Sequence, residues 1–164
     1  MRCKRNALLE INHSVAQRSY VDWKYKALVN LVRTPPKLRR TNGDRVAYRF
    51  TTLSLPALTA YYKLFYPFGK KIVPKITLTP LALAVWLMDD GHKSYNTIYL
   101  NTQQFSADSQ HALLSILKHQ WNIAAALNLD KTYYRIRISV KSIQRLKLLV
   151  EPYVLPGLRY KLPG

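Results

Sequence analysis

The sequence predicts an α+β fold in which antiparallel strands form sheets and the helices are segregated to one face. Short stretches of alternating apolar residues separate segments whose apolar residues recur at helical spacing. The chain also repeats itself, because residues 48–71 and residues 134–161 share the order strand, helix, aromatic–proline pair, glycine and lysine. Residues 9–28 and 99–117 likewise share a strand, an asparagine and a helix. These observations predict two halves of similar architecture.

The first half is expected to contain two strands and two helices. In order, we expect a strand at 7–14, a helix at 15–32, a basic loop at 33–45, a strand at 46–54 and a helix at 55–67. Val21 and Tyr25 recur at helical spacing in the first helix, and Pro35-Pro36 stops it. Asn42-Gly43 favours a tight turn. Pro56 suits the first turn of the second helix, where its missing N–H is not needed.

The second half is expected to begin with the most apolar helix of the chain. In order, we expect a helix at 79–91, a strand at 97–103, a helix at 106–121, a strand at 133–139 and a helix at 140–150. Thr79 before Pro80 is typical of a capped helix start, and Gly91 is the favoured residue just past a helix end. We therefore divide the chain into halves at 1–76 and 77–164.

The charge balance predicts a polyanionic partner. Twenty-six Lys and Arg stand against eight Asp and Glu, and the formal net charge is +18. A chain so charged opposes its own compaction unless a counter-charge is bound, and phosphates reward many cations at once. Nucleic acid is therefore the expected partner. An anionic membrane surface is the rival that we set aside, and the apolar run before Gly91 is too short to span a bilayer.

Other residue types exclude several classes of site. Cys3 is the single cysteine, so an internal disulfide framework and a thiolate zinc cluster are excluded. The four histidines lack metal-ligand spacing, and the five glycines form no phosphate-binding loop.

Two of the eight acids, Asp89 and Asp90, stand side by side at the end of the apolar helix. The C-terminal end of a helix carries partial negative charge, so a carboxylate there costs about 0.3–1 kcal/mol. A bound Mg²⁺ reverses that cost, because it takes carboxylate, backbone carbonyl and phosphate oxygens. Successive helical residues point about 100° apart, so only one aspartate can face a given site.

The stretch LAVWLMDDG, at residues 83–91, resembles the signature nonapeptide of the LAGLIDADG homing endonucleases. Further stretches extend the resemblance in the family's order: TPPK, YRF and FYPFGKKIVPK precede it, and LNTQQFS, YRIRIS and VEPYVLPGLRYKLPG follow it. Together they cover nearly the whole chain and resemble the double-motif branch found in organelle introns. The resemblance implies two pseudo-symmetric α-β-β-α-β-β-α halves whose antiparallel, saddle-shaped sheets lie in the DNA major groove.

The chemistry that the resemblance implies is hydrolysis of one phosphodiester in each DNA strand, with Mg²⁺ as the cofactor. The eighth position of the signature is the metal-binding aspartate, which is Asp90 here. Asp89 and Gly91 join it as lesser candidates at the same helix end. The family also places a lysine in each active site, and Lys71 and Lys161 match those positions. Each is expected to polarise water or to stabilise phosphate charge.

Polar residues of the strands and of one basic segment are candidates for nucleic-acid contacts. Arginine suits guanine and asparagine or glutamine suits adenine, although alternation lets only about half of the strand residues face DNA. The segment KLRR is expected to be a phosphate-contacting loop. The candidates are Lys37, Arg39, Arg40, Arg49, Lys70, Lys93, Asn101, Gln103, Arg135 and Arg137.

The chain departs from the double-motif pattern at its start. A first signature helix with its own aspartate is expected just before ALLEINHS, and MRCKRN cannot replace it. Three explanations are open: a truncated nuclease, a protein retained for binding alone, or a homodimer that pairs two Asp-Asp-Gly helices. The apolar seam left by the first signature helix would need a partner chain or a ribonucleoprotein to cover it.

Two functions therefore stay open. One is a Mg²⁺-dependent, site-specific homing DNA endonuclease. The other is a catalytically inactive RNA-binding protein on the same fold, such as an intron maturase or an organellar ribosome component. The 12 tyrosines can stack on bases and the cations can follow phosphates without a metal. The resemblance to intron-encoded proteins implies an organelle, either a mitochondrion or a chloroplast.

Overall fold

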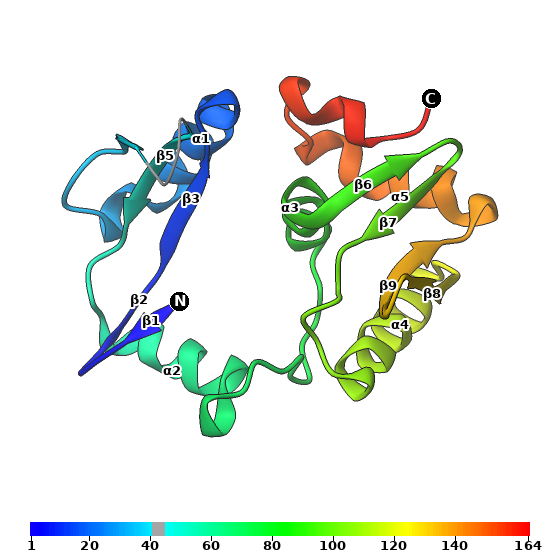
Figure 1. The fold of residues 1–164 in the computed structure, drawn as a ribbon, viewed down its shortest axis with the longest axis horizontal. Helices are drawn as coiled ribbons and strands as arrows, with labels where there is room; N and C mark the ends of the chain where they lie inside the picture. Colours follow the sequence, from blue (N-terminus) through cyan, green and yellow to red (C-terminus); the bar gives the residue numbers. More distant parts are fainter. Residues whose placement is uncertain (41–44) are drawn as a thin grey trace. The chain divides into compact units, whose positions relative to one another are not determined.

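The polypeptide folds as two units, Met1–Lys70 and Lys71–Gly164. A computed structural model describes residues 1–40 and 45–164, so the tight turn expected at Asn42-Gly43 lies outside the described residues. The division made from the sequence, after residue 76, falls slightly further along the chain than this boundary. Figure 1 labels most of the helices and strands of both units.

In its described residues, the first unit contains a two-stranded ribbon, a three-stranded antiparallel sheet of order β3-β5-β4, and two α-helices (Figure 1). Its elements are β1 (Arg2–Cys3), β2 (Ala7–Leu8), β3 (Glu10–Ser14), α1 (Arg18–Leu28), β4 (Lys37–Arg40), β5 (Val46–Thr51) and α2 (Pro56–Phe65). The helix expected at 15–32 is α1 with a 3₁₀ turn at each end. Pro56 occupies the first turn of α2, as predicted.

Helix α1 covers one face of the three-stranded sheet. Tyr48 and Phe50 of β5 are buried in a core with Val21 of α1, and Ile11 of β3 packs against it. Because strand residues alternate between faces, Arg49 lies on the opposite face, directly across from Asn12 of β3. The apolar pattern of these strands therefore fixes which cations face away from the core.

The segment Lys37–Arg40 is a strand, so the expected basic loop at this place was wrong. Strand β4 pairs antiparallel with β5, with Leu38 opposite Tyr48 and Arg39 opposite Ala47. Its single apolar residue is too little to display an alternating pattern in the sequence. All four residues are exposed, and a charged edge strand of this kind resists pairing with other chains.

The second unit contains a four-stranded antiparallel sheet of order β6-β7-β9-β8 and three α-helices. Its elements are α3 (Pro80–Asp90), β6 (Gly91–Ser94), β7 (Thr97–Leu100), α4 (Ala107–Trp121), β8 (Ala125–Asp130), β9 (Tyr133–Ile138) and α5 (Ile143–Val150). Five of these match the elements expected from the sequence. Helix α4 packs on β8 and β9, and α3 packs against α5 (Figure 1).

Strands β6 and β8 were missed by the sequence analysis. Strand β6 consists of GHKS, which has no apolar alternation, and it follows α3 without a connecting loop. The hairpin to β7 turns at Tyr95, whose φ is 50°. Strand β8 consists of AALNLD, whose alanines and asparagine favour strands weakly. It forms through pairing with β9 along its whole length.

The order of elements agrees with the internal repeat. In the first unit β3, α1, β4, β5 and α2 follow one another, and in the second unit β7, α4, β8, β9 and α5 do so. The sheet order β3-β5-β4 corresponds to β7-β9-β8. Within the described residues, the second unit adds α3 and β6 ahead of this set.

Candidate functional site

Helix α3 delivers the two adjacent aspartates to one edge of the second sheet. The Oγ1 of Thr79 accepts a hydrogen bond from the N–H of Ala82 at 3.1 Å, and Pro80 occupies the first turn. Leu83 and Leu87 are buried along the body of the helix. The helix ends at Asp90, and the next residue already belongs to β6.

Gly91 is required by the close approach of the strand to the helix. Its N–H donates to the carbonyl oxygen of Leu87. A Cβ at Gly91 would lie 2.3 Å from that oxygen, a separation that side-chain carbons do not tolerate. The requirement is one of space, because the φ of −74° is open to any residue. A glycine here lets the chain turn from helix to strand within one residue.

Both carboxylates lie at the solvent-exposed end of α3. The backbone N–H of Asn101 donates to the carbonyl oxygen of Asp90 at 3.0 Å. This bond continues the pairing of β6 with β7 by one step, since Gly91 is opposite Leu100. The end of the helix is thereby fixed to the sheet, beside the first residue that follows β7.

Lys161 is buried against the same helix end. The residue is only 8% exposed. Its Nζ donates hydrogen bonds to the carbonyl oxygen of Met88 at 2.5 Å and to that of Asp89 at 3.3 Å. An ammonium at this place satisfies carbonyls that a helix end leaves without partners and offsets the partial negative charge there. The structure therefore brings Lys161 next to the Asp89-Asp90-Gly91 segment, and the catalytic roles predicted for these residues stay predictions.

A hollow of about 760 Å³ opens beside this helix end and lies wholly within the second unit. It is lined by Asp89, Gly91, His92, Lys93, Tyr95, Asn101, Arg135, Tyr160 and Lys161. One acid, two amide or imidazole groups and three cations thus share one surface. Such a mixture suits a phosphate ester together with a hydrated cation.

The donor set fits Mg²⁺ in the form in which proteins usually hold it. Mg²⁺ keeps several waters and takes one or two carboxylates plus substrate phosphate oxygens. Asp89 lines the hollow, and Asp90 is the exposed residue beside it that ends the helix, so either one can supply a carboxylate at this helix end. Among residues 1–40 and 45–164, no group of three or more His, Cys, Asp or Glu forms a complete protein cage for a metal.

Neither Lys70 nor Lys71 is among the residues described as lining this hollow. The ammonium of Lys71 is 4.6 Å from the centre of the Phe105 ring, a cation–π contact. Lys70 is exposed at the end of the first unit. The roles predicted for these two lysines stay predictions.

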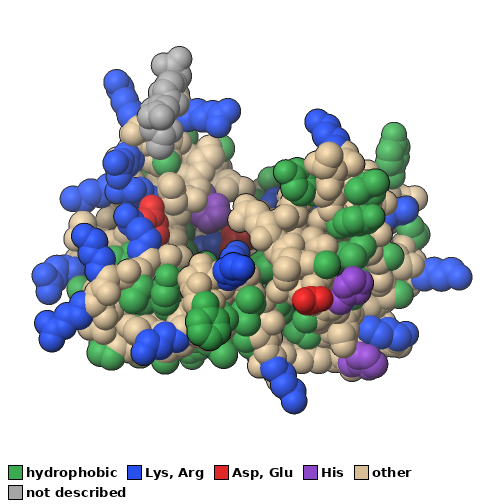
Figure 2. Space-filling model, turned by 60° about the horizontal axis from the view of Figure 1, so that its bottom comes forward, with side chains coloured by type: hydrophobic (Ala, Val, Ile, Leu, Met, Phe, Trp, Pro, Cys, Tyr) green, Lys and Arg blue, Asp and Glu red, His purple; other side chains and the backbone are tan. Residues whose placement is uncertain are grey.

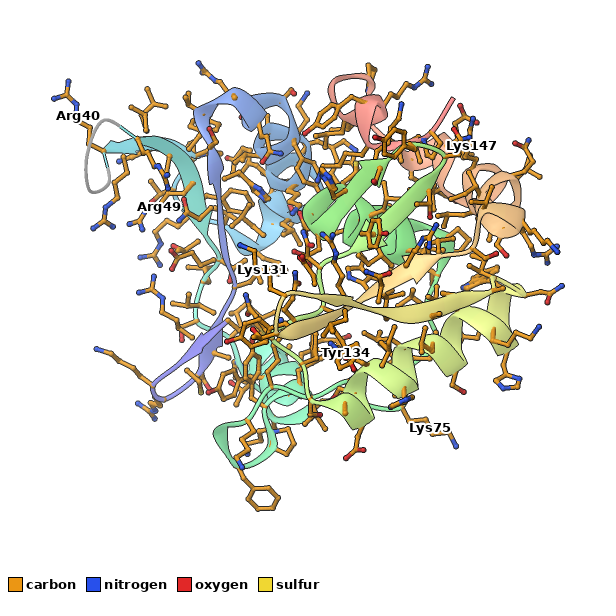
Figure 3. All side chains as sticks on the ribbon, turned by 45° about the vertical axis from the view of Figure 1, so that its right-hand side comes forward. Arg40, Arg49, Lys75, Lys131, Tyr134 and Lys147 are labelled. Atoms are coloured by element: carbon orange, nitrogen blue, oxygen red, sulfur yellow. The ribbon has the colours of Figure 1, made fainter. Side chains whose placement is uncertain are left out.

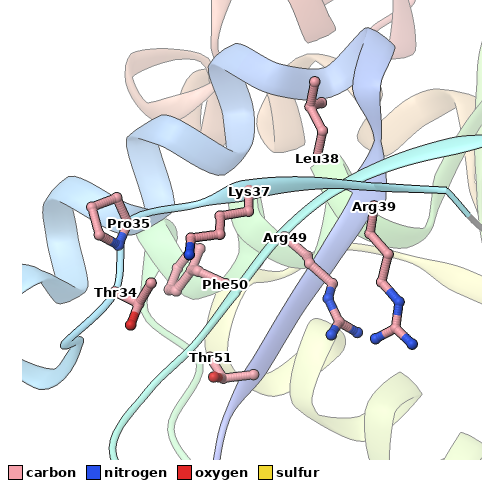
Figure 4. A pocket seen from close by; sticks show the side chains of 8 residues that line it. All are labelled: Thr34, Pro35, Lys37, Leu38, Arg39, Arg49, Phe50 and Thr51. Atoms are coloured by element: carbon pink, nitrogen blue, oxygen red, sulfur yellow. The ribbon is translucent and has the colours of Figure 1, made fainter.

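The first sheet presents three of the predicted cations together. Lys37, Arg39 and Arg49 line a hollow of about 470 Å³. Figure 4 shows the Arg39 and Arg49 side chains pointing to the same side, while Leu38 points the opposite way. The strand register explains this, because Lys37 pairs with Arg49 and the alternating residue Arg39 shares their face.

Arg40 differs from these three cations. It pairs with Val46, so alternation gives it the face of Leu38 rather than that of Arg39. Its side chain projects outward at the end of β4, away from Arg49 (Figure 3).

The second sheet presents Arg135 and Arg137 around one tyrosine. The guanidinium carbons of these residues are 4.2 and 6.0 Å from the centre of the Tyr99 ring. Arg137 is directly opposite Tyr99 in the sheet. Because Ile136 and Ile138 are buried on the other face, both arginines lie on the face that is turned away from the helices.

The two remaining candidates on this sheet occupy different positions. Lys93 pairs with the buried Ile98, so alternation separates it from the Tyr99 face, although it still lines the hollow. The Nε2 of Gln103 donates to the Oδ1 of Asn101 at 3.5 Å. Gln103 therefore lies beside the hollow rather than in the sheet.

Four residues in or beside the hollow were missed by the sequence analysis: His92, Tyr95, Tyr99 and Tyr160. Tyr95 lies in the turn of the β6–β7 hairpin, which the sequence analysis did not recognise. Tyr99 belonged to a predicted strand, and alternation from the apolar Ile98 and Leu100 was a signal that could have placed it on the polar face. His92 and Tyr160 had no such signal, because β6 was not recognised and Tyr160 belongs to a 3₁₀ segment.

The surface agrees with the charge balance of the sequence. On the face shown in Figure 2, Lys and Arg side chains are spread widely and acidic side chains are few. Across the residues that the structure describes, none of the helices has the length and apolar character needed to cross a membrane.

Comparison with known proteins identifies a family. The model of the LAGLIDADG DNA endonuclease family matches residues 1–146. The cytochrome b mRNA maturase bI2 of Debaryomyces hansenii is 27% identical over 94% of this chain, and the chain spans only 59% of that relative. The probable intron-encoded endonuclease 1 of Wickerhamomyces canadensis is 29% identical over 97% of this chain and 75% of that protein.

A solved structure gives the same result for the fold. The homing endonuclease I-WcaI bound to its DNA recognition sequence superposes with a TM-score of 0.87 at 26% identity, covering 99% of this chain and 78% of that one. The α+β fold with antiparallel sheets that the sequence predicted is therefore confirmed.

Proposed function

The chain belongs to the LAGLIDADG DNA endonuclease family, and we propose that it binds duplex DNA and hydrolyses phosphodiesters at a specific site with the help of Mg²⁺. The observation that carries this proposal is the hollow in which Asp89, Lys161, Asn101 and Arg135 come together beside the end of α3. A homing endonuclease of the same fold is known bound to its DNA recognition sequence, which supports duplex DNA as the partner.

In this proposal Asp90 holds Mg²⁺, and Asp89 and Gly91 belong to the same site. Mg²⁺ supplies an activated water and charge stabilisation for the attacking and leaving oxygens. Lys161 holds the helix end through the Met88 and Asp89 carbonyls and contributes positive charge near the phosphate. Lys71 is proposed as the second lysine of the family pattern. It does not line the hollow beside α3.

The sheet faces are proposed as the DNA-contacting surfaces. In the first unit Lys37, Arg39 and Arg49 share one face. In the second unit Arg135 and Arg137 share the face turned away from the helices. Arginines in antiparallel strands can reach base edges in a major groove, and lysines can neutralise phosphates.

Substitution of Asp90 tests the proposed chemistry. Asp90→Asn keeps the size of the side chain and removes its charge, so we expect Mg²⁺-dependent cleavage of a plasmid library carrying random sites to fall by at least about 100-fold, as a lost charge-stabilising group commonly does. The variant should still bind DNA. Asp108→Asn, in the first turn of α4, makes the same charge change away from the hollow and should cleave like the wild type.

A second function is favoured by one specific observation, namely that a relative is named as a cytochrome b mRNA maturase. On this alternative the same basic and aromatic surface binds structured RNA and cuts nothing. Binding of intron RNA and of duplex DNA should be measured at equal salt, because both depend strongly on it. Tight RNA binding together with no cleavage of any duplex would replace the nuclease proposal by this one.

We further propose that the protein originates from an organelle intron. The named relatives support this, since one is a cytochrome b mRNA maturase and another is a probable intron-encoded endonuclease.

A further inference from the structure

Two acids stand within the strands of a surface that is otherwise basic. Among the acids that the structure describes, only Glu10 of β3 and Asp130 of β8 belong to strands. Each contacts an arginine of a neighbouring strand. The Nη1 of Arg49 is 3.4 Å from Glu10 Oε1, and the Nη1 of Arg135 is 3.5 Å from Asp130 Oδ2. An acid on a surface that binds a polyanion repels its phosphates. The presence of these two acids therefore calls for another role.

The two arginines occupy equivalent places in the repeat. Arg49 is paired with Asn12 across β5 and β3. In the second sheet Leu100 is paired with Ile136, so the next step of the antiparallel register brings Asn101 beside Arg135. Both arginines follow a tyrosine in their strand, in YRF and in YRI. Each unit therefore sets an arginine of its inner strand next to an asparagine and supplies that arginine with an acid.

The acids engage the same nitrogen in both units. Each acid contacts Nη1 of its arginine, and one acceptor there leaves a second N–H of Nη1 and both N–H of Nη2 able to donate. In the described part of the chain, no hydrogen bond joins Nη2 of either arginine to another residue. The Nε of Arg135 is buried, so the terminal Nη1–Nη2 edge is the donor edge that a ligand can reach.

The position of each guanidinium is restrained. Arg135 is held by Asp130 on one side and lies over the Tyr99 ring at 4.2 Å on its face. Arg49 is held by Glu10, which Arg2 also contacts. A long side chain with a fixed fork loses less freedom on binding than a mobile one.

We propose that Arg49 and Arg135 are equivalent base-reading residues, each held by its acid so that the terminal Nη1–Nη2 edge can donate two hydrogen bonds to one guanine. Glu10 and Asp130 are positioning residues for sequence specificity. The O6 and N7 acceptors of guanine in the major groove match a bidentate arginine, and the neighbouring Asn12 and Asn101 suit an adjacent adenine. This inference rests on the proposed function, since it requires a duplex DNA ligand.

The test uses duplexes selected from a random library by the full wild-type chain, followed by affinities for each single-base change in the selected site. Arg49→Lys and Arg135→Lys keep the charge and lose the fork. Each should lose the preference for guanine at one position, by about tenfold or more, and keep the preferences elsewhere.

The acid variants supply the sharper test. Glu10→Gln and Asp130→Asn should each weaken the preference at the same position as the matching arginine variant, while their affinity for unrelated duplexes stays equal or rises. Asp108→Asn is the matched control, because it removes one negative charge from α4 and should change no positional preference. Thermal unfolding of every variant shows whether it is folded.

The outcomes separate the inference from the proposed function. A wild-type chain that selects no duplex overturns both. A chain that selects a duplex, but whose acid variants change all positions alike or none, overturns the inference alone. Loss of guanine preference at two separate positions, one for each Arg–acid pair, is the result that we expect.

Discussion

Lys161 joins the C-terminal 3₁₀ segment of the second unit to the end of α3. Its ammonium bonds the carbonyl oxygens of Met88 and Asp89 from within a buried position. These carbonyls sit next to two carboxylates, where the helix end is already negative. A single cation thus stabilises the segment that carries the candidate metal site.

Removal of this cation should therefore reduce the stability of the fold as well as any activity. Lys161→Met keeps most of the apolar stem and removes two charge-assisted hydrogen bonds, so we expect the free energy of unfolding to fall by about 1.5–3 kcal/mol. Urea denaturation measures it. Lys141→Met removes the same charge from an exposed position and should change the value little. Equal losses in both variants would contradict the anchoring role.

Tyr48 gives the first unit a dependence on alkaline pH. Burial, and then the hydrogen bond that its hydroxyl donates to Asp22 at 3.0 Å, raise the pKa of Tyr48 above its ordinary value of 10.0. The neutral phenol is thus favoured in the folded state. Its contribution to stability is complete below pH 10 and is lost as the pH rises through the higher folded-state pKa.

The variant Tyr48→Phe has no phenol to ionise, so this part of the loss of stability at alkaline pH should be missing from it. We expect the free energy of unfolding to fall less steeply above pH 10 in Tyr48→Phe than in the wild type. Tyr133→Phe removes an exposed phenol and should retain the wild-type slope. A wild-type slope in Tyr48→Phe would show that the burial of this phenol is unimportant for the pH dependence.

Some residues of the candidate site could be predicted from the local sequence, and others could not. Asp89, Asp90 and Gly91 stood out because two acids at a helix end conflict with its dipole. Lys161 was found only through the repeat and the family resemblance. Its bonds to the α3 carbonyls could not be foreseen, because they depend on tertiary packing of segments far apart in the chain.

At the scale of elements, α3 begins with a cap that the sequence shows. The Oγ1 of Thr79 accepts from the Ala82 N–H, so Thr79→Ala should lower the free energy of unfolding by about 1 kcal/mol. Thr79→Ser should retain most of it. Thr77→Ala, at an exposed residue ahead of the helix, is the control in the same urea titration. A loss of stability in Thr77→Ala as large as in Thr79→Ala would contradict the cap.

Elements with strong local signals were predicted, and those that depend on a partner strand were not. Helix α4 has a serine cap, and Asn122 ends it in the left-handed region with φ of 52°. Strand β7 shows apolar alternation. Strands β4, β6 and β8 carry charges, glycine or alanine instead, and they form because a neighbouring strand supplies hydrogen bonds.

At the scale of the whole molecule, the internal repeat and the net charge are the two sequence features that best predicted the architecture and the type of partner. A net charge of +18 predicted a nucleic-acid partner, and each unit presents arginines on the face of its sheet that the helices leave uncovered. The acids occupy few places: among the described residues, one pair ends α3 and single acids contact Arg49 and Arg135. Four of the seven described acids therefore lie at the proposed metal site or beside the proposed base-reading arginines.

The most direct test of the account is to locate a divalent cation at the end of α3. Mn²⁺ in place of Mg²⁺, added with a DNA duplex, broadens the NMR signals of nearby amides. We expect the amides of Gly91 and Asn101 to broaden first in the wild type and to remain sharp in Asp90→Asn. Equal broadening in the variant, or broadening confined to residues away from this helix end, would contradict the proposal that Asp90 binds the catalytic metal.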